Sequence, residues 1–230
     1  MIFKIMNHAV ILDNIPIRRY NISVPSSYIY LRKGYEMKFI GFYNYTVILT
    51  YMSLISGAIG MKFAYDGIPG LAILCLLISG VCDLFDGVVA RSKKKRTANE
   101  KSFGIQLDSL CDVICFGVFP AVFLYFNGVN SIGGIALLIF YILCAVIRLA
   151  FFNVLESNRQ ASEDGCAKGY RGLPVTSAAM IFPFFYLLGL FIPANVMTVI
   201  YYILPALIGV LFIADFRVPK LDIAKLMRKH

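Results

Sequence analysis

Six stretches of about 20 mostly apolar residues constrain the fold of this chain more than any other feature. An α-helix needs about 20 residues to cross the roughly 30 Å hydrocarbon core of a bilayer. The stretches lack the alternation of apolar and polar residues that is typical of membrane β-barrel strands. The sequence therefore predicts an all-α integral membrane protein, a six-transmembrane-helix bundle with spans at 46–65, 68–89, 105–126, 132–154, 174–191 and 196–214.

The composition excludes the main alternatives to a membrane protein. The chain is 59% hydrophobic and 15% charged, with a mean hydropathy of +0.75, whereas soluble domains carry about 25% charged residues. Disorder is excluded for the same reason. Six cysteines in 230 residues, most of them inside apolar runs, do not indicate a disulfide-rich secreted scaffold. We expect membrane lipids as partners and no nucleic acid, although the net charge is +9.

Short connections rich in Gly and Pro leave little room for a second domain. We expect one domain over residues 37–216, followed by a basic cytoplasmic tail at 217–230. Residues 1–36 contain no apolar run that is long enough to span and no signal-peptide pattern. They are read either as a cytoplasmic segment on the membrane surface or as a gene-model extension upstream of a start at Met37.

The basic residues predict the orientation in the membrane. Of the 22 Lys and Arg residues, only Lys62 falls near the side opposite to the others. Twenty lie before the first span, between spans two and three, between spans four and five, or after span six, and Arg148 lies near the cytoplasmic end of span four. Because cytoplasmic loops carry the excess of Lys and Arg, we expect a multi-pass protein of the cell membrane with both termini in the cytoplasm. The basic run 93–96 fits such a topology signal and a site for anionic lipid headgroups.

Four aspartates lie where ionisable residues are costly. Asp83 and Asp86 fall near the cytoplasmic end of span two, and Asp108 and Asp112 near the start of span three. Separations of three and four residues place each pair on one helix face. Four carboxylates at one depth repel strongly unless cations neutralise them. Oxygen ligands favour Mg²⁺ or Mn²⁺ over zinc, and four acids suit two divalent ions that promote phosphoryl displacement. An active site facing the cytoplasm is therefore expected.

The residues around these acids are suited to a diphosphate. Gly87 and Ala90 are small enough to let a ligand approach the backbone, and Arg91 provides a forked cation. Gly104 lies one turn before Asp108 and opens the facing helix in the same way. The pattern predicts a site for metal and diphosphate within the membrane.

The motif Asp83-x2-Asp86-Gly87-x2-Ala90-Arg91, followed by Gly104-x3-Asp108-x3-Asp112, resembles the signature of the CDP-alcohol phosphotransferases. Members of that family are six-helix membrane enzymes that transfer a phosphatidyl or related group from a CDP-linked donor to an alcohol, and the resemblance implies a homodimer. It assigns the first three aspartates to metal, and Asp112 to metal and to the general base. Twelve residues separate Arg91 from Gly104, where the family usually has eight.

Further nucleotide contacts follow from the same resemblance. Thr50 joins Asp83, Gly87, Ala90, Arg91 and Gly104 in the predicted nucleotide site, because Leu49-Thr50-Tyr51-Met52-Ser53-x3-Gly57 resembles the family's first-helix pattern. That pattern usually has Asn in place of Ser53. No histidine competes for the role of base, since the two in the chain are His8 and His230. The cysteines beside the acids are read as small buried hydrophobes.

The acceptor is predicted from two other stretches. The run 147–153 and the loop 170–176 resemble the phosphatidylserine synthase branch of the family. A zwitterionic amino acid needs a cation for its carboxylate, which Arg148 can bind bidentately. Asn153, Arg171 and the turn 172–174 complete the predicted acceptor site. The predicted reaction transfers the phosphatidyl group of CDP-diacylglycerol to L-serine and releases CMP.

Alternatives remain at each level. Arg148 can instead reach the membrane interface or pair with a structural acid. The same chemistry can serve another acceptor, such as glycerol phosphate, an inositol phosphate or choline. Acids inside a bundle also occur in cation channels and transporters, but here they crowd into the cytoplasmic half of the spans.

Overall fold

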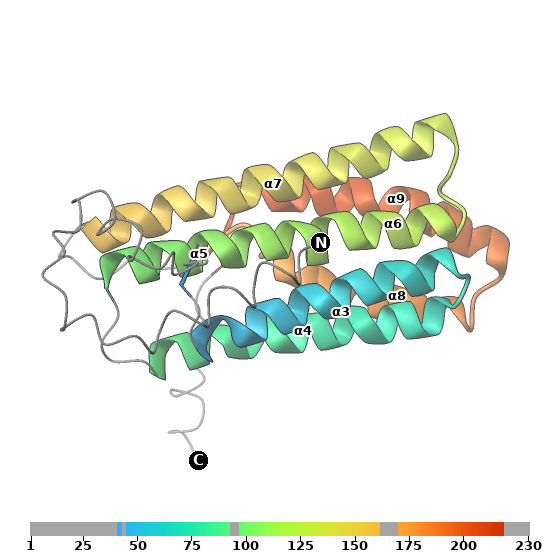
Figure 1. Cartoon of the computed structure of the whole chain (residues 1–230). Coiled ribbons are helices and arrows are strands. Elements are labelled where there is room, and N and C mark those ends of the chain that lie inside the picture. Colours follow the sequence, from blue (N-terminus) through green and yellow to red (C-terminus); the bar gives the residue numbers. More distant parts are fainter. Residues whose placement is uncertain (1–40, 43–44, 93–96, 162–169, 219–230) are drawn as a thin grey trace, which may run out of the picture. The chain divides into compact units, whose positions relative to one another are not determined.

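The computed structural model describes residues 41–42, 45–92, 97–161 and 170–218, which form an almost entirely helical bundle (Figure 1). The N-terminal stretch 1–36, the basic run 93–96 and the tail beyond residue 218 lie outside the described residues. In chain order the elements are the 3₁₀-helix η2 (Tyr45–Val47), α3 (Ile48–Tyr65), α4 (Pro69–Ser92), α5 (Ala98–Asp112), the π-helix η3 (Val113–Val118), α6 (Phe119–Phe126), α7 (Ile132–Ala161), β1 (Tyr170–Arg171), the 3₁₀-helix η4 (Val175–Ser177), α8 (Ala178–Gly189), α9 (Ala194–Ile213) and β2 (Arg217–Val218).

Within the described residues, five helical segments are long and apolar enough to cross a membrane, in agreement with five of the predicted spans. They are Ile48–Tyr65, Pro69–Val89, Ala98–Phe126, Ile132–Ser157 and Ala194–Ile213. The predicted span 174–191 corresponds to η4 and α8, a shorter apolar helix of Val175–Gly189 that contains Pro183. The chain is thus a multi-pass helical protein with five candidate spans, and the count of six stays a prediction.

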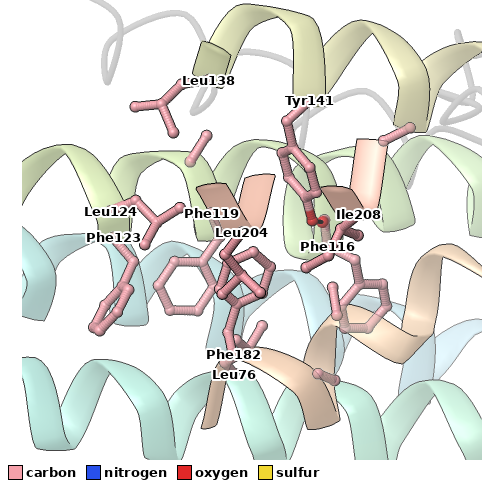
Figure 2. Close-up of a cluster of buried hydrophobic side chains, with 14 of the residues drawn as sticks. Leu76, Phe116, Phe119, Phe123, Leu124, Leu138, Tyr141, Phe182, Leu204 and Ile208 are labelled. Atoms are coloured by element: carbon pink, nitrogen blue, oxygen red, sulfur yellow. Dashed lines mark hydrogen bonds between the residues drawn. The ribbon is translucent and has the colours of Figure 1, made fainter. Parts of the chain in front are cut away.

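The third span forms the centre of the bundle. Its apolar part is 61% buried, whereas the other four spans are 28–39% buried. Figure 2 shows Phe116, Phe119 and Phe123 of η3 and α6 in a cluster with Tyr141 of α7 and with residues of α4, α8 and α9. Burial of large aromatic side chains dominates core packing. This apolar cluster therefore anchors the same continuous helix that carries Asp108 and Asp112.

This central helix begins earlier than the predicted boundary at residue 105. Thr97 accepts a hydrogen bond from the Glu100 N–H through Oγ1 (3.2 Å), and the Glu100 carboxylate accepts from the Thr97 N–H (3.0 Å). The reciprocal bonds form a capping box, which satisfies two donors at the helix start. The pattern Thr97-x2-Glu100 was present in the sequence, so the earlier start was predictable.

A π-helical segment follows Asp112 directly. Pro120 explains part of this irregularity, because it has no N–H to donate to the Phe116 carbonyl one turn earlier. That carbonyl accepts a hydrogen bond from the buried Tyr141 hydroxyl of α7 instead. Single π-helical turns inside α-helices are frequent at functional sites. Periodicity did not predict this segment, because residues 113–126 are mostly apolar and contain no polar residues against which a change of helical phase would show.

Small residues allow α3 to pack closely on its neighbours. One face of α3 buries Ser53, Ser56, Gly57 and Gly60 against α4 and the third span. A Cβ atom on Gly57 would lie 3.0 Å from Cys115 Sγ. Small residues at helix interfaces let membrane helices approach, and serine hydroxyls bond across them. Ser53 accordingly bonds the Ser79 side chain (2.7 Å).

The strands β1 and β2, of two residues each, form a short antiparallel pair. The expectation of an all-helical protein did not include this pair. Tyr170 pairs with Val218 and Arg171 with Arg217. The pair joins the segment before α8 to the segment after α9. Strands of two residues carry too little periodicity for sequence patterns to indicate them.

Gly60 provides a test of the close packing. A Cβ atom there would lie 2.3 Å from the Phe119 ring and 2.8 Å from the Cys75 Cβ. We expect Gly60→Ala to lower the free energy of unfolding by about 1–3 kcal/mol, the usual cost of overpacking, measured as thermal unfolding in detergent. Gly133→Ala is the matched control, because nothing lies within 4 Å of its Cβ position. Equal melting temperatures for the two variants would contradict the packing described here.

Candidate functional site

The structure brings three of the four aspartates together. Asp83 of α4 and Asp108 and Asp112 of α5 each place one carboxylate oxygen within 4.8 Å of the others. Asp83 and Asp108 are half-buried, and Asp112 is buried. Residues from two helices and separate parts of the chain thus meet at one point. This is the geometry expected of ligands for a divalent cation.

The fourth aspartate, Asp86, lies beside this trio and is oriented by α3. It is buried, and its Oδ2 accepts a hydrogen bond of 2.9 Å from the Thr50 hydroxyl. Electrostatic interactions connect Asp86 with both Asp108 and Asp112. All four predicted acids therefore belong to one cluster, although the tightest group contains three.

The cluster lacks internal compensation for its negative charge. Asp108 Oδ1 is buried and has no hydrogen-bond partner. Among the described residues, no salt bridge joins these carboxylates to Lys or Arg; the only pair there is Lys62 with Asp66. Buried carboxylates require a partner or a metal ion. An all-oxygen donor set with an unsatisfied oxygen fits a hard cation such as Mg²⁺ or Mn²⁺.

The predicted diphosphate residues lie on the two helices that carry the acids. Gly87 is half-buried one residue after Asp86, and α4 continues through Ala90 and Arg91. The Ala90 and Arg91 side chains lie outside the described part of the structure. Gly104 is half-buried in α5, one turn before Asp108. The backbone thus places these residues beside the acids, and their ligand contacts stay predictions.

Thr50 has a contact that sequence reasoning missed. The sequence predicts Thr50 in the nucleotide site. The structure adds that its hydroxyl donates a hydrogen bond to Asp86. Hydrogen bonds to a ligating carboxylate fix its orientation and tune its metal affinity. A hydroxyl-bearing residue on the buried face of α3 indicates a buried hydrogen bond. The sequence does not indicate its partner, because Asp86 lies 36 residues away in the chain.

Asn153 of α7 contacts the helix that carries the acids. Its Oδ1 accepts a hydrogen bond from the Ser109 hydroxyl (2.8 Å), and its Nδ2 donates to Gln106 Oε1 (3.4 Å). Ser109 directly follows Asp108 in the chain. The predicted acceptor residue Asn153 therefore lies next to the acid cluster and holds α7 against α5.

Arg148, within α7, contacts the loop 170–176 that was predicted to line the acceptor site. Its Nε donates to the Leu173 carbonyl (3.2 Å), and it interacts electrostatically with Asp215. Arg171 contributes its backbone to β1, and its side chain lies outside the description. Arg148 thus has an acidic neighbour, as the structural alternative anticipated, and it also lies beside the predicted acceptor loop.

The cysteines near the acids are buried in the bundle. Five of the six cysteines are described, and all five are free and buried. The group of possible ligands in the described residues contains aspartates and no cysteine. Cys111 and Cys115 fill space in the bundle, as the sequence interpretation expected.

Comparison with known proteins identifies the class of protein that this bundle and its acids represent. The family model for CDP-alcohol phosphatidyltransferases matches residues 43–214, which include every described helix of the bundle. The chain belongs to the CDP-alcohol phosphatidyltransferase family. The resemblance carried by the aspartate motif is thereby confirmed.

Individual relatives are similar over much of this region. The archaetidylserine synthase of Methanothermobacter thermautotrophicus is 30% identical over 192 residues, which cover 81% of this chain and 74% of that protein. The CDP-diacylglycerol–serine O-phosphatidyltransferase of Methanocaldococcus jannaschii is 36% identical over 63% of this chain and 62% of its own length. The Saccharomyces cerevisiae protein of the same name is 35% identical over 46% of this chain and 38% of its own length. No solved structure matches the chain significantly.

The Thr50 contact generates a test of the metal site. We expect Thr50→Val to weaken Mn²⁺ binding by about tenfold, because removal of a hydrogen-bond donor to a ligand typically has this effect. Titration of purified protein followed by the Mn²⁺ electron paramagnetic resonance signal measures it. Thr50→Ser keeps the hydroxyl and retains affinity. Ser56→Ala is the control, because Ser56 donates to the Cys75 carbonyl and not to an acid; unchanged Mn²⁺ affinity in Thr50→Val would refute the orienting role.

Proposed function

We propose that this protein transfers the phosphatidyl group of CDP-diacylglycerol to L-serine, giving phosphatidylserine and CMP. The observation that carries the proposal is the convergence of Asp83, Asp108 and Asp112 inside a chain of the CDP-alcohol phosphatidyltransferase family. The relatives described above support serine as the acceptor, because their names share serine and differ in the lipid. CDP-linked archaeol is accordingly a second donor to test.

The proposed reaction is a direct displacement at the lipid-bearing phosphorus. Asp112 takes the proton from the serine hydroxyl, whose oxygen forms a bond to that phosphorus. The bond between this phosphorus and the oxygen bridging to the CMP phosphate breaks, and CMP departs with the electron pair. A buried carboxylate next to the acceptor is suited to this proton transfer, and Asp112 is the most buried of the four acids.

The four aspartates are the proposed ligands of two divalent ions, Mg²⁺ or Mn²⁺. When bound, such ions neutralise charge on the diphosphate and on the departing CMP. Thr50 orients Asp86, and the unsatisfied Asp108 oxygen supplies a further ligand atom. Gly87, Ala90, Arg91 and Gly104 bind the nucleotide and diphosphate in this proposal.

The acceptor binds, in this proposal, on the α7 side of the acid cluster. Arg148 binds the serine carboxylate, and Asn153 and Arg171 complete the site. The Asn153 contact to Ser109 supports this assignment, because it places α7 directly against the helix that carries the acids. Glycerol phosphate, inositol phosphate and choline are the alternative acceptors for the same chemistry.

Release of CMP tests the reaction and its base. We expect detergent-purified protein with CDP-diacylglycerol to release CMP only with L-serine and Mg²⁺ or Mn²⁺, and a chelator to stop it. Asp112→Asn is expected to lower the rate by about a hundredfold or more, the usual contribution of a general base. Asp66→Asn is the control, because its exposed pair with Lys62 lies far along α3 from Thr50. CMP release with another alcohol and none with serine would overturn the acceptor assignment.

We also propose a homodimer in the cell membrane with six spans, both termini and the active site on the cytoplasmic side. The loops after α3 and α6 then face outward, and the start of α5 faces the cytoplasm (Figure 1). The distribution of basic residues supports this orientation.

Labelling from outside the cell tests the orientation. In intact cells, a membrane-impermeant thiol reagent is expected to label Asp66→Cys and to spare Thr97→Cys. The unsubstituted protein is the background control, since its described cysteines are buried. Labelling of Thr97→Cys in sealed cells would reverse the proposed topology.

A further inference from the structure

The segment after α9 folds back onto the segment before α8. We call residues 170–173 together with 211–218 the clasp. The Gly172 N–H donates to the Phe216 carbonyl (2.7 Å), and the Leu173 N–H donates to the Leu211 carbonyl (3.3 Å). These bonds extend the strand pair β1–β2. The clasp therefore holds together the segment before α8 and the segment after α9, which are about 40 residues apart in the chain.

The centre of the clasp admits no side chain. Gly172 has a φ of +70°, a left-handed conformation that favours glycine. A Cβ atom at this position would lie 2.8 Å from the Ala214 carbonyl oxygen and 3.7 Å from Arg148 Cζ. The backbone at Gly172 thus lies close both to the segment after α9 and to the Arg148 guanidinium of α7.

Arg148 interacts with both halves of the clasp. Its Nε donates to the Leu173 carbonyl on one side, and its charge interacts with Asp215 on the other. A free arginine side chain samples many rotamers, and fixing one of them costs conformational entropy. The hydrogen bond to Leu173 and the charge of Asp215 restrict the guanidinium in advance, which reduces that cost for any ligand that binds it afterwards.

We propose that Asp215 is a positioning residue that holds the Arg148 guanidinium in the orientation in which it binds the carboxylate of the amino acid acceptor. The inference rests on the proposed function. A guanidinium has five N–H donors, so the bond to Leu173 uses one and leaves others for a substrate carboxylate, while Asp215 acts on Arg148 through its charge. The chain beyond the last span thereby sets the affinity for the acceptor while making no contact with the reacting phosphorus.

Full-length Asp215→Asn tests the proposal, with steady-state kinetics in both substrates. We expect the KM for L-serine to rise about tenfold, as for loss of a partner that orients a ligand-binding side chain. The KM for CDP-diacylglycerol and kcat are expected to stay within about twofold. Asp215→Glu keeps the charge and is expected to restore most of the affinity for serine. Asp66→Asn, which removes an exposed acid elsewhere, leaves both constants unchanged.

Gly172→Ala is the second variant, because it disturbs the clasp without touching a charge. It is expected to raise the KM for serine in the same direction. Its melting temperature, and that of Asp215→Asn, separates a shift in affinity from a failure to fold. If Gly172→Ala does not fold, the KM for serine of a stable Asp215→Asn protein still tests the proposal.

Three results would overturn the inference. An unchanged KM for serine in Asp215→Asn shows that Asp215 does not position Arg148. A lowered KM shows that Asp215 competes with the acceptor carboxylate. A parallel rise in both KM values shows a general structural role. A wild-type protein that releases no CMP with serine is a different failure, because it removes the proposed function itself.

Discussion

Mutual repulsion among carboxylates inside a membrane-embedded bundle is the constraint on which the rest of this structure depends. Asp83, Asp108 and Asp112 approach within 4.8 Å with no cationic side chain paired to them in the described residues. In a low-dielectric interior such a group separates unless packing or bound cations oppose the repulsion. Packing acts from α3, whose small buried face seats it against α4, and from the third span, which is the most buried helix. The arrangement is thus prepared for divalent cations.

The third span combines two requirements that conflict along one helix. Its first half carries the acids, and its second half carries the aromatic cluster around Phe116 and Phe119. The π-helical segment between them changes the helical phase directly after Asp112. Pro120 removes a backbone donor there, and the Tyr141 hydroxyl compensates the Phe116 carbonyl. An apolar anchor and a polar site can therefore face different neighbours on the same continuous helix.

The proposed acceptor side is assembled from parts that lie far apart in the chain. Through Asn153, α7 is fastened to α5 beside Asp108, and through Arg148 it reaches the clasp. Both contacts are made by one helix, so its position couples the acid cluster to the segment after α9. Family members that share the acids can differ in acceptor through such peripheral contacts, since function resides in sites that are built on a common fold.

Much of this protein follows from the sequence by itself. Apolar stretches of about 20 residues predicted five helices that the structure contains, spacings of three and four residues placed the aspartates on common faces, and the motif identified the family. The capping box at Thr97 was also readable. Tertiary structure alone decided that Thr50 bonds Asp86, that Asn153 bonds Ser109 and that Asp215 lies near Arg148. The reason is physical: periodicity reports which face of a helix is buried, whereas the partner of a buried polar group depends on how distant segments pack.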